Sequence, residues 1–570
     1  MSLYGAIQPF VDVALVFALI LALAPFFGSY LGRVFQNRPV FGDSVLLPLE
    51  RFVYRLIGTD SRHSMRPREY LFALFLVNVA LLLWIFLLTS IQPVLPLNPA
   101  GLPAMSPDLA FHTSASFVTN TDFTHFTAET QMSMGAALLG LQVAFFLAPA
   151  TGLAALVALV RGFVRKDGTV GNFYVDLVRS VTRVLLPVAV LGAVILVVLG
   201  LPQTFTNSVI VHPILGGTQT IVLGPAASWE SIMMLGSNGG GYYTANAASP
   251  FENPSAISSL FQTGLMMLLP FSAPFAFSAI VRRKGEGLPY LGTILIVIFI
   301  ALGLFIYAQN QPNALFNSIP LLSHGPQYYS VGQDLRFSPN EASFFQVISV
   351  YANVGANNMA IGSLPPLAEM DLLFGMFTQS TPGGVGTGFG TLLIYGIISI
   401  FLGGLMVGRT PEYLGKKITK EHVRWSALVL LIHPALIFIP TVITILAGIT
   451  PLPGGPLGAQ SHAFTIILYE FTSESANNGS AMSSPTYIDN TFWMNIIGAI
   501  IVLFGRFIPI VAMVVIGGLF SRQDVLPPGP GTLRTKSVTF TVYLALLLIV
   551  LSALLFLPVL ALGPLAQLGL

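Results

Sequence analysis

The sequence predicts an all-α polytopic membrane protein with about ten transmembrane helices, with four span–pore-loop–span repeats around a central ion pathway and extra outer helices. Its 570 residues are 54% hydrophobic and only 8% charged, whereas an ordinary soluble domain is about 25% charged. Apolar stretches of roughly 20 residues, long enough to cross a bilayer, recur along the chain. Polar segments rich in glycine and asparagine lie between some of these stretches and predict the pore loops.

The apolar stretches define the predicted spans. The first has no basic residue before it and is long for a signal peptide, so we predict that it is a retained helix. Cysteine is absent, which excludes disulfides and thiolate metal sites. In chain order, the spans are predicted within 7–27, 70–89, 135–160, 181–200, 260–281, 289–308, 391–408, 425–447, 493–520 and 537–558.

Charged residues orient the predicted spans. All but two of the 25 Lys and Arg residues lie in every second loop, the exceptions being Arg336 and Arg506. Basic residues collect in cytoplasmic loops, so both termini are predicted on the outer side. The outer loops carry carboxylates, which predict an approach that attracts cations, although positive-inside sorting alone also depletes outer loops of bases. They include Asp122, Glu129, Glu230, Glu252, Glu369, Glu470 and Glu474.

Four outer segments share one layout, a short apolar stretch followed by a polar Gly/Asn-rich stretch. They are 109–126, 230–246, 343–360 and 463–481, and aligning Asp122, Gly239, Gly355 and Gly479 separates them by 117, 116 and 124 residues. Parallel repeats place their shared site on a common axis. We therefore predict a single membrane domain, 1–570, with repeats at 70–160, 181–281, 289–408 and 425–520, flanked by helices at 7–27 and 537–558.

The glycines of these segments favour a cation filter over four ordinary surface loops. Irregular backbone at membrane depth is tolerated where it lines a watery cavity or is buried in protein. Backbone oxygens that point inward on successive residues need unusual dihedrals, which glycine adopts without steric cost. Four such strands can replace the hydration shell of a monovalent cation. A half-helix before each strand would direct its negative dipole end at the cation.

Several motifs resemble one known family. "SNGGGYYTANAASPFENP", "SFVTNT", "SANNGSA", "GGVGTG", "GRTPEYLGKK" and "FGRF" are similar to KdpA, the family of potassium-binding subunits of bacterial Kdp potassium-transporting ATPases. The resemblance extends from the first span to the closing "LPVLALGPLA". It implies a fold related to the Trk/Ktr/HKT potassium transporters and a place in the bacterial cytoplasmic (inner) membrane. The implied partners are the P-type ATPase subunit KdpB, KdpC and the small subunit KdpF. Potassium is the implied ion, ATP binds only to the partner, and no organic cofactor is implied.

The resemblance also implies the residues of a potassium filter. These are Asn120 and Thr121 in the first loop, Ser237, Asn238 and Gly239 in the second, Val354 and Gly355 in the third, and Asn477, Asn478 and Gly479 in the fourth. Two departures from the family pattern stand out. "NTDFT" leaves the Asp122 carboxylate near the predicted mouth, and the third loop matches only around Gly355.

Arg506 is predicted to control the pore together with Asp122. It lies near the middle of the span at 493–520, where a charge is costly and usually faces the bundle interior. A lipid-facing arginine is the less favoured alternative. Asp12 lies nearer the outer end of its span and carries a weaker prediction. The glycine-rich stretch 383–390 is interpreted as a flexible or close-packed hinge.

The basic run 408–425 is predicted to lie in the cytoplasm. It contains Lys416, Lys417, Lys420 and Arg424. Such clusters commonly bind anionic headgroups of membrane lipids, and this run could also face the catalytic partner. The net charge of +2 indicates no nucleic-acid partner.

The sequence lacks the motifs of an ATP-hydrolysing enzyme. Neither a G-x-x-x-x-G-K-[ST] phosphate loop nor a "DKTGT" phosphorylation sequence occurs. The eight histidines show no zinc spacing, because His112 and His125 are too far apart for one helical face. We therefore expect a non-catalytic transport subunit. The alternatives are a stand-alone potassium channel or secondary transporter, and a membrane-embedded enzyme, which would need buried acid, base or metal ligands.

Overall fold

The computed structural model describes residues 3–311, 332–406, 408, 411–449, 457–482, 489–525, 527 and 533–568. Ten helical segments in this part of the chain are long and apolar enough to cross a membrane, which confirms the predicted all-α polytopic fold. They are α1 (Leu3–Phe35), α3 (Pro67–Ser90), α6 (Met134–Ala136) continuing as α7 (Gln142–Gly162), α8 (Phe173–Arg179) continuing as α9 (Leu186–Val198), α11 (Ala256–Ile280), α12 (Leu288–Gln309), α16 (Thr387–Met406), α17 (Lys420–Leu446), α19 (Phe492–Phe520) and α20 (Val538–Leu562) with α21 (Pro564–Gln567).

Outer and inner spans alternate. In α3, α9 and α17 only 33% of the most apolar window is buried inside the protein, and in α12 50% is buried. The spans that follow them, α7, α11, α16 and α19, reach 83%, 72%, 78% and 61%. Each outer helix is thus followed by an inner one that builds the centre of the bundle. The predicted flanking helices, α1 at 22% and α20 at 33%, lie outside.

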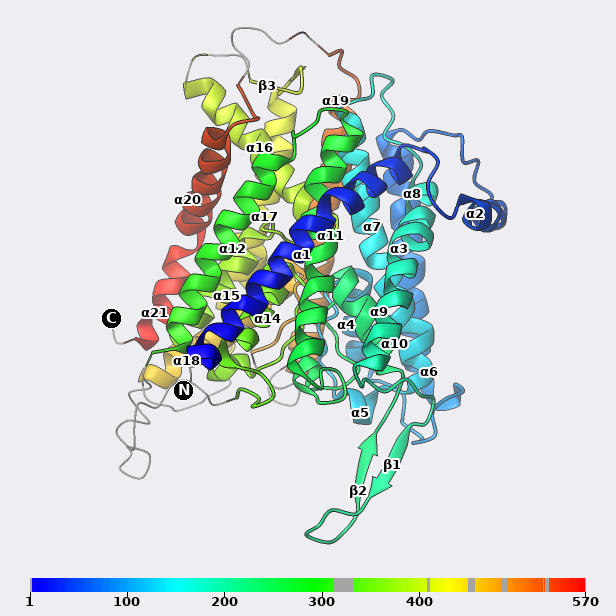
Figure 1. The fold of residues 1–570 in the computed structure, drawn as a ribbon, viewed down its shortest axis with the longest axis vertical. Coiled ribbons are helices and arrows are strands. Elements are labelled where there is room, and N and C mark those ends of the chain that lie inside the picture. Colours follow the sequence, from blue (N-terminus) through cyan, green and yellow to red (C-terminus); the bar gives the residue numbers. More distant parts are fainter. Residues whose placement is uncertain are drawn as a thin grey trace.

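The first helix is longer than the sequence predicts. The apolar stretch was expected to end at residue 27, but α1 continues to Phe35 and slants across α11 (Figure 1). Small residues let the two helices approach closely. A Cβ atom on Gly28 would lie 2.5 Å from the carbonyl oxygen of Ser272, and one on Gly32 would lie 2.5 Å from Cβ of Ala279. Packing against α11 therefore extends the helix beyond its apolar stretch.

A helix precedes each of the four polar segments, and three of the four are short, as predicted, with 11 to 13 residues, whereas α18 has 20. The four are α4 (Pro107–Val118), α10 (Ala226–Gly236), α14 (Pro339–Tyr351) and α18 (Leu457–Ala476). Just beyond each, one residue adopts a left-handed conformation, with φ of 61° at Asn120, 55° at Ser237, 49° at Asn353 and 55° at Asn477. These positions are equivalent in the sequence alignment of the four segments. The backbone therefore turns in the same way four times, while the boundaries of the four repeats stay a prediction.

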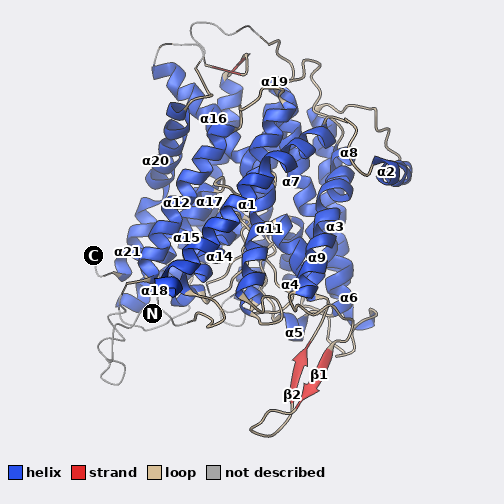
Figure 2. Ribbon diagram, in the orientation of Figure 1, coloured by secondary structure: helices blue, strands red, loops and turns tan. Residues whose placement is uncertain are grey.

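The two ends of the bundle carry different small elements. An antiparallel hairpin of β1 (Ser208–Val211) and β2 (Gln219–Val222) projects from one end (Figure 2). Both chain termini lie in the half of the molecule that carries this hairpin (Figure 1). The opposite end carries helix α2 (Asp43–Ile57) and the short pair β3 (Glu412–Tyr413) and β4 (Lys416–Lys417). We call these the hairpin end and the α2 end.

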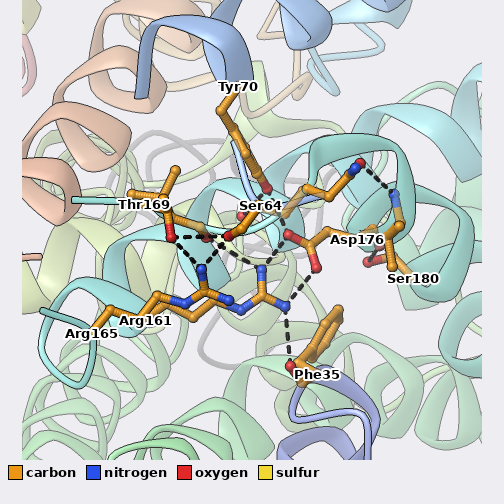
Figure 3. A network of polar contacts seen from close by, with 12 residues as sticks. Phe35, Ser64, Tyr70, Arg161, Arg165, Thr169, Asp176 and Ser180 are labelled. Carbon is orange, nitrogen blue, oxygen red and sulfur yellow. Dashed lines mark hydrogen bonds and ion pairs between the residues drawn. The ribbon is translucent and has the colours of Figure 1, made fainter. Parts of the chain in front are cut away.

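A buried ion pair fastens the helices at the α2 end (Figure 3). Both guanidinium Nη atoms of Arg161 contact Asp176, at 2.5 and 2.7 Å. Arg161 also donates to the carbonyl of Phe35 at 3.0 Å. The hydroxyl of Tyr70 donates to Asp176 at 3.0 Å. A buried pair persists when further hydrogen bonds satisfy its remaining polar atoms, so this network links α1, α3, α7 and α8.

Candidate functional site: a four-loop junction

The four polar segments meet at the centre of the bundle. We call residues 119–122, 237–240, 353–356 and 477–480 the four-loop junction. A Cβ atom added to Gly239 would lie 2.8 Å from the carbonyl oxygen of Thr121, 2.9 Å from that of Val354 and 3.0 Å from that of Asn478. The three oxygens come from the three other loops and occupy equivalent positions in the repeat. Segments up to about 360 residues apart in sequence are thus brought together around one glycine.

Two further glycines are required by the backbone of the junction. Gly355 and Gly479 have φ of 79° and 95°, where a side chain is strained. A Cβ atom would overlap the carbonyl oxygen of Asn478 at Gly355 and that of Thr121 at Gly479. Both positions were predicted from the sequence as filter glycines, and the structure places both against carbonyls of neighbouring loops.

The asparagine side chains link the loops to one another. The amide of Asn120 donates to the carbonyl of Ser237, and that of Asn353 donates to Ala476 at 3.0 Å. The amide of Asn477 donates to Oγ1 of Thr121 at 2.8 Å. These bonds join loop one to two, three to four and four to one. Among the described residues, no such amide bond joins the second loop to the third.

The predicted residues Asn238, Asn478 and Ser237 are also buried in the junction. Asn238 donates to the carbonyls of Phe145 and Ile232, both at 3.3 Å, and Asn478 donates to that of Val350 at 2.9 Å. These amides therefore support the backbone rather than face a common centre. Asn353 was missed from the sequence, although its alignment with Asn120 and Asn477 was a usable signal.

The sequence predicted that Asp122 lies near the outer mouth of the pore, but the structure buries it. Its side chain is fully buried, and its carboxylate oxygens have no hydrogen-bond partner in the described part of the chain. Arg506 interacts with it electrostatically across the protein interior. The expectation was wrong because the irregular segment that follows α4, residues 119–126, lies inside the bundle and is mostly buried. Bulk salt therefore does not act on this buried carboxyl group as it would on a surface carboxylate.

The predicted acidic outer surface is also largely wrong, because most of its carboxylates are buried. Glu230, Glu252, Glu369, Glu470 and Glu474 are all buried, with at most 1% of each residue exposed. Amide groups donate hydrogen bonds to three of them, Glu252, Glu369 and Glu470. Glu252, for example, accepts from the amide of Tyr243 at 2.8 Å. These three carboxyl groups therefore support the loops from within the protein.

Arg506 lies inside the bundle, beside the junction. Only 5% of the residue is exposed. Its guanidinium donates to Oγ1 of Thr387 at 2.8 Å and to the carbonyl of Ala148 at 3.2 Å. A small cavity is lined by Arg506 together with Asn353 and Asn477. The cation therefore faces the same space as two junction residues, and its part in pore control stays a prediction.

The glycine-rich stretch 383–390 is close-packed. It follows α15 (Pro366–Thr378) and leads into α16. A Cβ atom on Gly152 of α7 would lie 2.5 Å from the carbonyl oxygen of Val385 and 3.0 Å from Nη2 of Arg506. One on Gly383 would lie 2.5 Å from Cα of Gly388. Of the two predicted readings of this stretch, the structure shows close packing against α7 and the arginine.

Lys416 is buried, although the sequence predicted an exposed basic run. Its ammonium donates to the carbonyls of Gly162, Arg165 and Phe520 at 2.8, 2.5 and 2.7 Å. Burial lowers the pKa of Lys416 to about 8. These carbonyls lie at or just beyond the ends of α7 and α19, where helices favour a cation. Lys416 is thus unavailable to lipid, whereas Lys417, Lys420 and Arg424 are exposed and keep that prediction.

Two histidines, which the sequence spacing predicted to be too far apart to share a site, lie next to each other in the structure. His112 lies on α4 and His125 follows the first loop of the junction. Their rings stack with centroids 3.6 Å apart and planes 7° apart. Glu474 on α18 completes a buried group whose ligand atoms lie within 4.8 Å of one another. The spacing rule failed because it considers one helix, whereas this group draws on two helices and a loop.

Comparison of the sequence with known proteins identifies one family. The family described as the potassium-transporting ATPase A subunit matches residues 14–568. The potassium-transporting ATPase potassium-binding subunit of Nostoc sp. is 37% identical over 565 residues, 98% of each chain. That of Alicyclobacillus acidocaldarius is 38% identical over 570 residues, 100% of this chain and 99% of its own. The crystal structure of the potassium transporter TrkH from Vibrio parahaemolyticus is 15% identical, with a TM-score of 0.49 over 90% of this chain and 98% of its own.

Proposed function

The chain belongs to the family of potassium-transporting ATPase A subunits, and on this premise we propose that it binds and selects potassium at the four-loop junction. It is the potassium-binding subunit of an ATP-driven uptake complex rather than the catalytic subunit. The relatives named above as potassium-binding subunits match over nearly their whole length. ATP is bound only by the partner, and the transported ion is potassium.

The observation that supports this proposal most strongly is the surroundings of Gly239. Carbonyl oxygens of Thr121, Val354 and Asn478 approach this glycine from three other loops. Rings of backbone carbonyls replace the hydration shell of potassium in selective pores. The carbonyl of Gly239 itself accepts a hydrogen bond from the side-chain amide of Asn246 at 2.7 Å. The main role of Gly239 is therefore to leave space for the three carbonyls, because it has no side chain. A desolvated cation fits such a ring better than an anion or a neutral solute.

The four helices that precede the polar segments add a second contribution. α4, α10, α14 and α18 all end at the junction, so four C-terminal dipole ends are directed toward it. Each end carries roughly half a negative elementary charge. This arrangement favours a cation without a fixed carboxylate in contact with it. Monovalent ions can therefore bind and still leave.

We assign the hairpin end to the outside of the bacterial cytoplasmic (inner) membrane. Most Lys and Arg residues lie in the loops of the other end, as expected for cytoplasmic loops. Both termini are then outside. Arg506 and Asp122 would control passage below the outer approach, because both side chains are buried in the bundle at or beside the junction.

Concentrative uptake requires partner subunits. The sequence has no phosphate loop and no phosphorylation motif, and only a partner that interacts differently with two states can move an equilibrium between them. We assign the catalytic role to the P-type subunit KdpB, with KdpC and KdpF completing the complex. Potassium would pass from below the junction to the catalytic subunit.

Reconstitution in liposomes tests this function. We expect negligible potassium flux through the chain alone, and ATP-dependent potassium uptake when the partner subunits are added. The measurement is potassium-selective fluorescence in vesicles with and without ATP, and vesicles with the partner subunits alone serve as the control. Rapid, selective and ATP-independent flux through the isolated chain would contradict the proposal and favour the stand-alone channel or secondary transporter.

Asp122 gives a sharper test of the site. We expect Asp122→Asn to weaken apparent potassium affinity about tenfold, about 1.4 kcal/mol, because the amide replaces a buried carboxyl group within the four-loop junction. The loss should be the same at low and high ionic strength, since Asp122 is buried. Uptake is measured over a range of potassium concentrations at two salt concentrations. Asp334→Asn, at a partly exposed carboxylate paired with Arg336, is the matched control. A loss that high salt abolishes would place Asp122 at the surface instead.

A further inference from the structure

A second group of polar side chains lies behind the junction. The group consists of His112 on α4, His125 in the loop between α4 and α5 (Ala128–Gln131), and Glu474 on α18. Each of them is at most 1% exposed. Nε2 of His112 lies 3.6 Å and Nε2 of His125 lies 3.7 Å from the same oxygen, Oε1 of Glu474. The proposed potassium function uses none of these three side chains.

Hydrogen bonds assign the proton on His125. Nδ1 of His125 contacts Oδ1 of Asn495 at 2.8 Å. The amide nitrogen of Asn495 donates to Oδ2 of Asp108 at 2.7 Å, so its oxygen faces the histidine. That oxygen can only accept, which places the proton of neutral His125 on Nδ1. Nε2 of His125 is therefore left with a lone pair directed toward Glu474.

Within the described residues, the polar atoms that these three side chains turn toward one another have no hydrogen-bond partner. In the described part of the chain, Nε2 of His125, both ring nitrogens of His112 and both carboxylate oxygens of Glu474 have no hydrogen-bond partner. Buried polar atoms without partners cost several kcal/mol and are rare in native proteins. A lone pair that faces a carboxylate adds repulsion. The arrangement calls for a positive species between the three side chains.

We propose that His112, His125 and Glu474 bind a divalent transition-metal ion of the zinc class. Two imidazoles and one carboxylate are a known set of zinc ligands, with bond lengths of about 2.0–2.2 Å, and tetrahedral ligands at that distance lie about 3.4 Å apart. The two nitrogen–oxygen separations here are 3.6 and 3.7 Å. A small closing of the carboxylate toward the rings, with the rings opening slightly from their stack, brings the three atoms onto one ion.

The surroundings of the group also resemble a metal site. Metal-binding histidines usually donate their other ring N–H to an oxygen, which fixes the ring. Asn495 and Asp108 provide this support for His125. Gly498 of α19 leaves the space, because a Cβ atom there would overlap Oε1 of Glu474 and lie 3.1 Å from Cδ2 of His112. Sodium and potassium prefer oxygen ligands, whereas imidazole selects zinc, copper or nickel.

A metal here would act on the frame of the junction. Glu474 lies three residues before Asn477, which bonds Thr121 of the first loop. His112 and His125 lie on either side of that first loop in sequence. The ion would therefore fasten the first loop to the fourth from behind. This inference does not depend on which ion passes through the junction.

Metal analysis of the purified full-length chain tests the proposal. The chain is prepared with a tag free of histidine, stripped with a chelator and dialysed against zinc. We expect about one zinc ion per chain in the wild type, and a loss of most of it in His125→Gln and Glu474→Gln. His212→Gln, at an exposed histidine near the hairpin, is the matched control and should keep the zinc. Equal zinc content in all four proteins would overturn the proposal.

A spectroscopic measurement guards against variants that fail to fold. Cobalt added to the stripped wild type should give the intense visible absorption of a tetrahedral ion, and zinc should displace it. Asn495→Ala, which removes the support of His125, should weaken cobalt affinity about 10–100-fold, as loss of such support does elsewhere. Absence of a cobalt spectrum in the folded wild type would show that protons alone occupy the group, and would also overturn the proposal.

Discussion

Replacing Gly239 by aspartate is expected to abolish high-affinity potassium uptake. The first atom of any side chain at this position would lie 2.8–3.0 Å from carbonyl oxygens of three other loops. At least one of these oxygens must then move, and a carboxylate would be forced against a ring of partial negative charges. We expect a loss of about 100-fold or more in apparent potassium affinity, about 2.8 kcal/mol. Selection against sodium should fall at the same time.

The measurement is uptake by the complete complex over a range of potassium and sodium concentrations. Gly239→Ala should give a smaller loss, since it adds the steric clash without the charge. Gly303→Ala in α12 is the matched control, because a Cβ atom there meets nothing within 4 Å. Normal assembly with unchanged affinity and selectivity in Gly239→Asp would remove the second loop from the proposed filter.

Replacing Lys416 by methionine is expected to have the largest effect on stability. The change keeps most of the side-chain volume but leaves the carbonyls of Gly162 and Arg165 without their donor. The carbonyl of Phe520 also loses the ammonium but still accepts from the backbone N–H of Gln523 at 3.0 Å. Each buried unsatisfied acceptor costs about 1–3 kcal/mol, and water at the α2 end recovers part of this, so we expect a net loss of about 2–4 kcal/mol. α7 and α19 would separate at these ends.

Thermal unfolding of the detergent-solubilised chain measures this loss. Lys417→Met is the matched control, since Lys417 is adjacent and exposed and should change the midpoint little. Lys416→Arg should also destabilise, because a planar guanidinium does not fit a site shaped for three converging carbonyls. Equal midpoints for Lys416→Met and Lys417→Met would show that the buried ammonium contributes nothing to the fold.

Local signals in the sequence predicted most of the fold. A span needs only an apolar stretch of sufficient length, so all ten were found. The predicted ends of the spans were less accurate where packing between helices determines the length of a helix. One example is α1, which continues along α11 to Phe35. The helices before the polar segments were also predictable, because the glycines and asparagines that end them are adjacent in sequence. Left-handed residues at Asn120 and Asn477 fit this pattern.

Charged side chains were predicted less well, because their surroundings come from distant segments. Asp122 was expected near the surface and Lys416 in an exposed run, but both are buried by helices far away in sequence. The neighbours of Lys416 include Gly162, 254 residues away. The grouping of His112 with Glu474 likewise needs two helices from opposite ends of the chain. No periodicity within one segment can report such contacts.

The four loops of the junction belong to one polypeptide, and each has its own sequence. In a pore built from four identical chains, a single mutation in the gene alters every quarter of the ion site at once. Here a mutation alters one loop of the proposed site. Gly239 faces carbonyls of all three other loops, whereas the carbonyl nearest to Gly355 is that of Asn478. Mutations can therefore change the proposed coordination shell one loop at a time, and a mutation that damages one loop leaves the other three unchanged. Gene duplication followed by divergence would leave this kind of record, in which symmetry persists in the backbone after it has faded from the side chains.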